Sequence, residues 1–190
     1  MDKWKQVKWT EARQIAAAMD LDSAALPEEG VDPLTYYQGL KERGEFDRAI
    51  SYLGHALPRF EAVSWAAHLI KSLPNNAQLL PLNRQALDRT LQWLEDPTDE
   101  YRRAAHQAAE LAGRDSAERL LAMAAFMSGG SISSPDLPPV NPPQEVCGQM
   151  AAAAVIVAAH RSDDAPGAIA MALDSGEKVA ARGIQALADR

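Results

Sequence analysis

Residues 146–160 read VCGQMAAAAVIVAAH, from Val146 to His160, and no polar side chain interrupts residues 150–159. A helix that is apolar on every face must be covered on every face, or it lies in a membrane. Spanning a bilayer takes about 20 apolar residues, and this run is much shorter. The segment therefore predicts a buried central helix in a protein without a membrane span. The side chains expected to be nearly inaccessible to solvent are those of Val155, Ile156 and Val157.

Apolar residues recur at helical spacing over most of the remaining chain. Residues 45–73 and 99–127 each have the pattern of two helices joined by a short turn. We therefore predict an all-α fold. It is a single domain over residues 10–190, with about eight or nine helices arranged as antiparallel hairpins around the central helix. Residues 1–9, MDKWKQVKW, alternate apolar and polar side chains and predict a short N-terminal arm.

Several residues have the chemistry of helix boundaries. Ser, Thr and Asp side chains accept hydrogen bonds from the free backbone N–H groups at a helix start, and a following proline suits the first helical position. The expected N-caps are Thr10, Asp32, Asp96 and Asp115. Glu118, three residues after Asp115, is expected to complete a capping box. Gly44 is expected to end one helix, and Gly176 is a candidate for a break in the last one.

Composition excludes several classes of function. The net charge of −7 disfavours nucleic acid as a partner, because phosphate binding needs a clustered basic face. Lys3, Lys5 and Lys8 are the nearest approach to a basic run and are too few for more than a weak patch. A single cysteine, Cys147, excludes an internal disulfide and predicts a buried, inert thiol. The N-terminus lacks the apolar core of a signal peptide. We therefore expect a cytoplasmic protein that binds neither nucleic acid nor a membrane.

Few residues have the spacing of a catalytic or metal site. His106 and Glu110 lie four residues apart, so both side chains could reach one metal ion, but zinc needs three or four ligands. A solvated helix face is the favoured interpretation. We therefore predict no metal, no cofactor and no catalytic residue from the sequence. An enzyme that assembles its site from distant residues remains an alternative.

Residues 128–144 cannot form a regular helix because five prolines fix φ and remove backbone donors. The loop opens with Ser-Gly-Gly-Ser, which is typical either of a helix C-terminus or, less favoured, of a backbone anion site. The prolines have P-x-x-P spacings that suit an aromatic-lined groove on a partner. The favoured alternative is an ordered loop lying across its own helices, with Leu137 and Val140 turned inward.

Two tryptophans near the N-terminus, Trp4 and Trp9, either fasten the arm to the domain or face a partner. The sequence favours neither alternative. The residues proposed as a candidate interaction surface are Trp4, Trp9, Ser128, Gly129, Gly130, Ser131, Pro138 and Pro139.

Three segments carry more than helical spacing: LPRFEAVSWAA at residues 57–67, DPTDEYRRAAHQAAELAG at 96–113 and AAFMSGGSISSPDLPPVNPP at 124–143. Together with the AAAAVIVAA run, they resemble a family of uncharacterised bacterial proteins of about this length, catalogued as a domain of unknown function. The chain departs from the family's pattern at Ser64 and Met127, where tryptophan is expected. The resemblance implies a bacterial, helical protein and supplies no activity.

These observations favour a bacterial cytoplasmic protein-interaction module, an adaptor or chaperone-like accessory factor with an unknown protein partner. The chain has no catalytic spacing, no basic face and no cofactor motif that would favour another class. An enzyme acting on a small molecule is the first alternative. A secretion-accessory or immunity-type protein with an acidic docking face is the second. The oligomeric state does not follow from the sequence.

Overall fold

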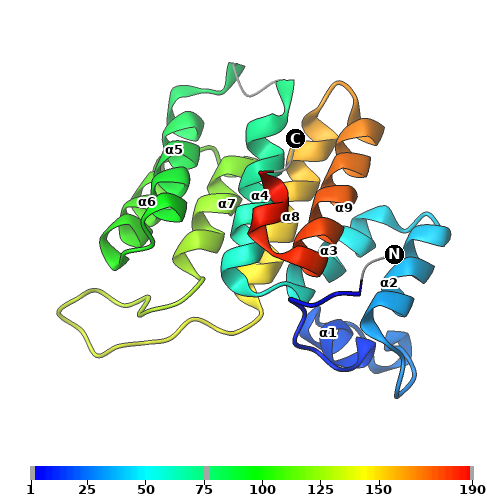
Figure 1. Ribbon diagram of the computed structural model, residues 1–190. Helices are drawn as coiled ribbons and strands as arrows, with labels where there is room; N and C mark the ends of the chain where they lie inside the picture. Colours follow the sequence, from blue (N-terminus) through cyan, green and yellow to red (C-terminus); the bar gives the residue numbers. More distant parts are fainter. Residues whose placement is uncertain (1–2, 75–77, 189–190) are drawn as a thin grey trace.

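The computed structural model describes residues 3–74 and 78–188 and is all-helical over these residues, as predicted (Figure 1). The described α-helices are α1 (Ala12–Ala18), α2 (Pro33–Glu42), α3 (Phe46–Ala56), α4 (Arg59–Ser72), α5 (Pro81–Glu95), α6 (Asp99–Leu111), α7 (Ala117–Phe126), α8 (Val146–Arg161) and α9 (Ala165–Arg182). Short 3₁₀ turns occur at η1 (Ser23–Ala25) and η3 (Ile184–Leu187). One core contains buried side chains from α1 through α9.

Helix α8 lies at the centre of the fold, packed against α3, α4, α7 and α9 (Figure 1). This confirms the prediction of a central helix, although α8 continues one residue further, to Arg161. Val155 is fully buried, whereas Ile156 and Val157 are only half-buried. The expectation that all three are nearly inaccessible was therefore wrong for two of them. Four neighbouring helices leave part of α8 uncovered, and a few partly exposed apolar side chains cost little.

Two glycines allow α3 and α8 to approach within backbone contact. A Cβ on Gly54 would lie 2.6 Å from the Gly148 carbonyl oxygen, and a Cβ on Gly148 would lie 2.4 Å from the Gly54 oxygen. Such distances are well inside van der Waals contact. Any side chain at either position would therefore separate the two helices. Helices α3 and α4, expected as a tight hairpin, contact each other little and instead both pack on α8.

The last helix is continuous, because α9 runs through Gly176 without a break. A Cβ on Gly176 would lie 2.8 Å from Leu53 Cδ1 and 3.1 Å from the Trp65 ring. The Trp65 indole N–H also donates to the Ala172 carbonyl at 2.9 Å. Gly176 therefore makes room for a tryptophan from α4, and the predicted interruption was wrong.

The capping predictions were correct for α2. Asp32 Oδ1 accepts from the backbone N–H groups of Leu34 and Thr35 at 3.0 and 3.1 Å. Gly44, just beyond the end of α2, has the left-handed φ of +73°. Local chemistry is enough at this helix because its boundary residues act on neighbours only a few positions away.

Three other boundaries differ from the predictions by one or two residues. Glu11, Thr98 and Ser116 are the N-cap residues, in place of Thr10, Asp96 and Asp115. Glu118 forms no capping box. Its side chain is fully buried, and Arg161 Nη2 donates to its Oε1 at 2.6 Å, which ties α7 to the end of α8. A buried carboxylate needs such a charged partner, and tertiary structure supplies it.

The described helices include none that combines the length and the apolar character required to cross a bilayer.

Candidate functional site

Two consecutive arginines of α6 hold the start of the proline-rich loop, residues 128–144. Arg102 Nη2 donates to the Ser131 carbonyl at 2.7 Å, and Arg102 Nη1 donates to the Phe126 carbonyl at 2.6 Å. Arg103 donates to the carbonyls of Ser131 and Ser133, both at 3.0 Å. We call these two side chains the arginine clamp. Hydrogen bonds to charged donors are about twice as strong as neutral ones, so the clamp fixes the direction in which the loop leaves α7.

Asp99, one turn earlier on α6, orients the arginine clamp. Its Oδ1 accepts from Arg102 Nε at 2.9 Å and its Oδ2 accepts from Arg103 Nε at 2.8 Å. These hydrogen bonds hold the pKa of Asp99 below its ordinary value, and the one from Arg103 has the larger effect. Arg102 is nearly buried, and its guanidinium lies 4.8 Å from the centre of the Phe126 ring. The carboxylate balances the buried charge.

Two properties of Gly130 allow the loop backbone to pass close to the arginine clamp. Its φ of +68° is left-handed, and a Cβ at this position would lie 3.1 Å from Arg102 Nη2. Only glycine adopts this φ at little cost. The candidate residues Ser128, Gly129, Gly130 and Ser131 therefore form the base of the loop. Two of their carbonyl oxygens accept from arginines: that of Ser131 from the clamp, and that of Ser128 from Arg59 Nη1 at 3.3 Å.

Beyond the clamp the loop folds back on itself. The Ile132 N–H donates to the Val140 carbonyl at 2.8 Å, and Ser133 Oγ donates to the Pro138 carbonyl at 2.7 Å. The Val140 N–H donates to Ser131 Oγ at 3.1 Å. The two arms of the loop are thus joined by hydrogen bonds, and the loop extends away from the helices at the lower left of Figure 1.

The far part of this loop faces solvent. Residues 134–141 are all exposed, with Leu137 at 56% and Val140 at 50%, while Pro142 is buried. The expectation that Leu137 and Val140 turn inward was wrong. The reason is that the arginine clamp and the internal hydrogen bonds stabilise the loop without any packing of its tip on the domain. Pro138 and Pro139, from the candidate surface, lie in this exposed run.

The two N-terminal tryptophans contact the domain. Trp4 is 8% exposed, and its ring centre lies 4.9 Å from that of Tyr37. The Gln6 N–H donates to the Ala180 carbonyl at 2.9 Å, and Trp9 Nε1 donates to the His55 carbonyl at 3.1 Å. Of the two alternatives, fastening of the arm to the domain describes Trp4. The half-buried Trp9 also lines a cleft.

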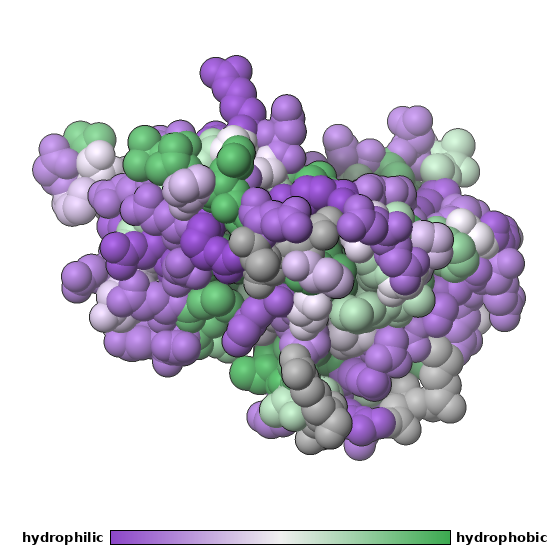
Figure 2. Space-filling model, turned by 90° about the horizontal axis from the view of Figure 1, so that it is seen from above, coloured by the Kyte–Doolittle hydropathy of each residue, from purple (hydrophilic) through white to green (hydrophobic). Residues whose placement is uncertain are grey.

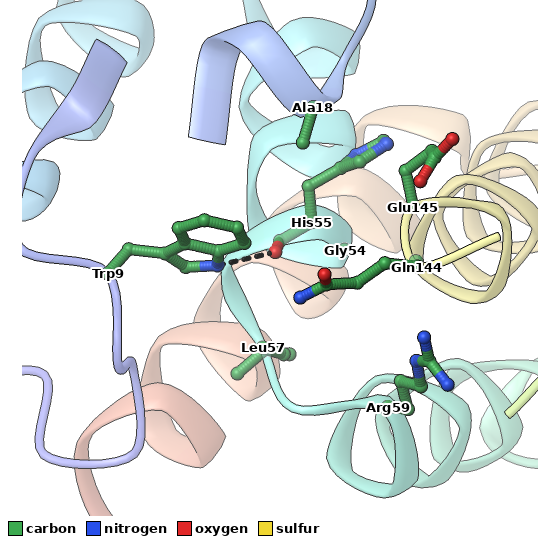
Figure 3. Close-up of a pocket in the computed structure, with 9 residues that line it drawn as sticks. Trp9, Ala18, Gly54, His55, Leu57, Arg59, Gln144 and Glu145 are labelled. Atoms are coloured by element: carbon green, nitrogen blue, oxygen red, sulfur yellow. Dashed lines mark hydrogen bonds between the residues drawn. The ribbon is translucent and has the colours of Figure 1, made fainter. Parts of the chain in front are cut away.

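This cleft surrounds His55, at the end of α3, and is shown in Figure 3. Its narrow part has a volume of about 100 Å³, and Trp9, Arg59, Gln144 and Glu145 line it together with His55. Gln144 and Glu145 belong to the end of the loop and the start of α8. The loop and the cleft therefore adjoin each other.

His55 has a defined tautomer within the cleft. Its Nδ1 lies 2.8 Å from the Ser51 carbonyl oxygen, so Nδ1 carries the proton and Nε2 is an acceptor. Burial lowers the pKa of His55, against the opposing effects of the Ser51 carbonyl and of Glu145. The ring is therefore neutral near pH 7.

Cys147 and His106 take structural positions. Burial raises the pKa of the Cys147 thiol to about 12, and Sγ lies 3.7 Å from the Arg59 carbonyl. The His106 ring stacks on Phe126, with centres 4.0 Å apart, and its Nε2 lies 3.8 Å from Glu110. Among residues 3–74 and 78–188, no cluster of three or more histidine, cysteine, aspartate and glutamate side chains is arranged to hold a metal ion.

A second surface feature is an apolar groove of about 470 Å³ between α2, α3 and α9, in which Phe46, Ile169 and Leu173 form the walls and Lys41 and Glu177 lie at the edge. Figure 2 shows a face of the molecule on which hydrophilic side chains prevail and hydrophobic ones form separate patches.

The comparisons with known proteins place these features in a family. A family model described as a family of unknown function, DUF6931, matches residues 36–180, well over half of the chain. The chain belongs to the DUF6931 family. No curated protein and no solved structure matches it. The DUF6931 match includes α6, the whole loop and α8, and thus both the arginine clamp and the loop that it holds.

Sequence reasoning did not identify the arginine clamp or the His55 cleft. The spacing of Asp99, Arg102 and Arg103 indicates ion pairs within one helix turn. It does not indicate that the same guanidinium groups reach carbonyls about 30 residues later. The cleft has no sequence signal, because α1, α3, α4 and α8 each contribute one or two residues to it.

Proposed function

We propose that this chain is a protein-interaction module of the bacterial cytoplasm, an adaptor or chaperone-like accessory factor. In this proposal the exposed run at residues 134–141 is the recognition element. The observation that carries the proposal is the combination of order and exposure: the base of the loop is clamped, while Leu137 and Val140 are 56% and 50% exposed.

The stability of the domain does not require this loop to be both rigid and exposed. A flexible connection of this length adds only a few kcal/mol of closure entropy, because that cost grows with the logarithm of length. The tip packs on nothing in the domain, so it contributes little to the core. A loop that is rigid before contact instead lowers the entropy lost on binding.

The chemistry of the run suits a specific kind of partner. Pro135, Pro138, Pro139 and Pro142 give two P-x-x-P spacings, and Leu137 and Val140 add apolar side chains between them. Extended proline-rich segments bind grooves lined by aromatic side chains. We therefore expect a partner protein with an aromatic-lined groove. Pro142 is buried, which leaves the spacing from Pro135 to Pro138 as the accessible one.

The experiment compares partner binding by loop variants in a bacterial lysate and then with the purified partner. Pro138→Ser/Pro139→Ser and Leu137→Ser/Val140→Ser should each abolish retention of the partner, while the melting temperature stays within about 2 °C of wild type. A synthetic peptide of residues 131–143 should compete for the partner.

Leu111→Ser is the matched control, since Leu111 is an equally exposed apolar residue (60%) on α6 and lies outside the loop. It should retain the partner. A lowered melting temperature in the proline variant, with partner binding preserved, would assign the loop a structural role and refute the proposal.

A further inference from the structure

The His55 cleft has three parts that share lining residues. The narrow part, of about 100 Å³, shares Trp9, Leu57 and Arg59 with an outer part of about 220 Å³. A third part, of about 690 Å³, is lined by Met19 and Gln149, which follow Ala18 and Gly148 of the narrow part in the chain. His55 lines all three parts.

One portion of the wall of the narrow part is apolar. Ala18, Gly54 and Gly148 leave the space open, and Leu57 and the Trp9 ring form its remaining apolar surface. The Trp9 indole N–H is already used, because it donates to the His55 carbonyl. Its ring face therefore contributes apolar contact. The space accepts a small group of several non-hydrogen atoms, with the outer part available for an apolar extension.

Polar groups of opposite charge converge on the same space. Figure 3 shows the Glu145 carboxylate beside the His55 ring, and the Arg59 guanidinium directed toward Gln144 on the other side of the cleft. His55 Nε2 is an acceptor. Arg59 uses one N–H for the Ser128 carbonyl and has further donors available in its guanidinium group.

This charge pattern disfavours simple ions. Glu145 repels a phosphate or another anion that would approach Arg59, and Arg59 repels a simple cation that would approach Glu145. A ligand that carries an ammonium and a carboxylate close together satisfies both. Such a ligand gains two charge-assisted hydrogen bonds in a partly enclosed site, where these are stronger than in water.

We propose that the His55 cleft binds a free α-amino acid with an apolar side chain. The ammonium group donates to Glu145 and to His55 Nε2, and Arg59 donates to the carboxylate. The side chain contacts Leu57 and Trp9 in the outer part of the cleft. This site is separate from the exposed run of the loop, so its test is independent of the protein-interaction proposal.

Titration calorimetry with the full chain tests the proposal, with L-valine and L-leucine as probes. At least one should give saturable binding. N-acetyl-L-valine lacks the ammonium group and L-valinamide lacks the carboxylate, so each should bind at least tenfold more weakly than valine.

Two variants test the site itself. Glu145→Gln should weaken binding at least tenfold, because it removes the partner of the ammonium. Glu61→Gln is the matched control: it removes a carboxylate from the first turn of α4, outside the cleft, and should bind as wild type does. Ala18→Leu should block binding by filling the narrow part without changing any charge, and its circular dichroism should match that of wild type.

Three results would overturn the proposal. The first is the absence of heat with both amino acids at millimolar concentration. The second is unchanged affinity in both Glu145→Gln and Ala18→Leu. The third is binding of trialanine, whose charged ends lie far apart, in preference to the free amino acids, which would assign the cleft to peptides.

Discussion

At the scale of single residues, Gly130 carries the clearest constraint. Its left-handed φ of +68° disfavours any L-residue, and an added Cβ would lie only 3.1 Å from Arg102 Nη2. Gly130→Ala should therefore lower the free energy of unfolding by about 1–2 kcal/mol, the cost of a left-handed conformation for an L-residue. Urea denaturation followed by circular dichroism measures the change.

The neighbouring glycine provides the control. Gly129 has no atom within 4 Å of an added Cβ and no positive φ. Gly129→Ala should therefore destabilise the domain by a few tenths of a kcal/mol at most. We expect it instead to be slightly stabilising, because alanine reduces the conformational entropy of the unfolded chain. Equal destabilisation by the two variants would show that the arginine clamp does not restrict this backbone.

At the scale of elements, the connection between α6 and the loop depends on pH. The carboxylate of Asp99 has a lowered pKa because Arg103 and Arg102 donate to it. Its contribution to stability is present above the pKa of the unfolded state, 3.8, and is lost as the pH falls through the lower pKa of the folded state. The backbone amide shifts of Ser131 and Ser133 should therefore change together below pH 3.8.

Nuclear magnetic resonance between pH 6 and about 2.5 follows this titration. In Asp99→Asn the transition should be absent, because the titrating group is gone. A transition that persists in the variant would mean that another carboxyl group controls the loop.

A second element-scale prediction concerns the crossing of α3 and α8. Gly148→Ala places a Cβ against the backbone of Gly54, which cannot move aside as a flexible side chain would. We expect a loss of about 1–3 kcal/mol from overpacking, measured by urea denaturation.

Gly39→Ala on α2 is its matched control. The nearest atom to an added Cβ there is Arg43 Nη1, the flexible end of a side chain, at 3.0 Å. Alanine favours a helix interior over glycine by about 1 kcal/mol, so this variant should be neutral or more stable. Stabilisation by both substitutions would contradict the close crossing.

At the scale of the whole molecule, His55 links the stability of the domain to pH. Burial lowers the pKa of His55 below its ordinary value of 6.5, so the unfolded chain takes up a proton at a higher pH than the folded domain does. The contribution is complete above pH 6.5 and is lost as the pH falls through the folded pKa. The melting temperature should fall over this range.

Differential scanning calorimetry at a series of pH values measures this dependence. His55→Gln keeps a polar side chain but cannot be protonated, and its melting temperature should vary less between pH 7 and about 5 than that of wild type. An unchanged pH profile in the variant would assign the dependence to other groups.

The sequence by itself was sufficient for the features that depend on near neighbours. The apolar run at residues 150–159 predicted the central helix α8, and Asp32 with Gly44 predicted the boundaries of α2. It also carried the resemblance to a family of unknown function, which the family match supports. Hydrophobic periodicity and caps act over a few residues, so a single sequence contains them completely.

Tertiary structure decided the features that join distant parts of the chain. Leu137 and Val140 face solvent because arginines from α6 hold the loop base, and Glu118 is buried because Arg161 from α8 neutralises it. Gly176 packs on Trp65 instead of breaking its helix. The His55 cleft exists only where α1, α3, α4 and α8 meet. The physical reason is the same throughout: side-chain direction and charge pairing depend on which elements lie opposite each other, and no local pattern specifies that.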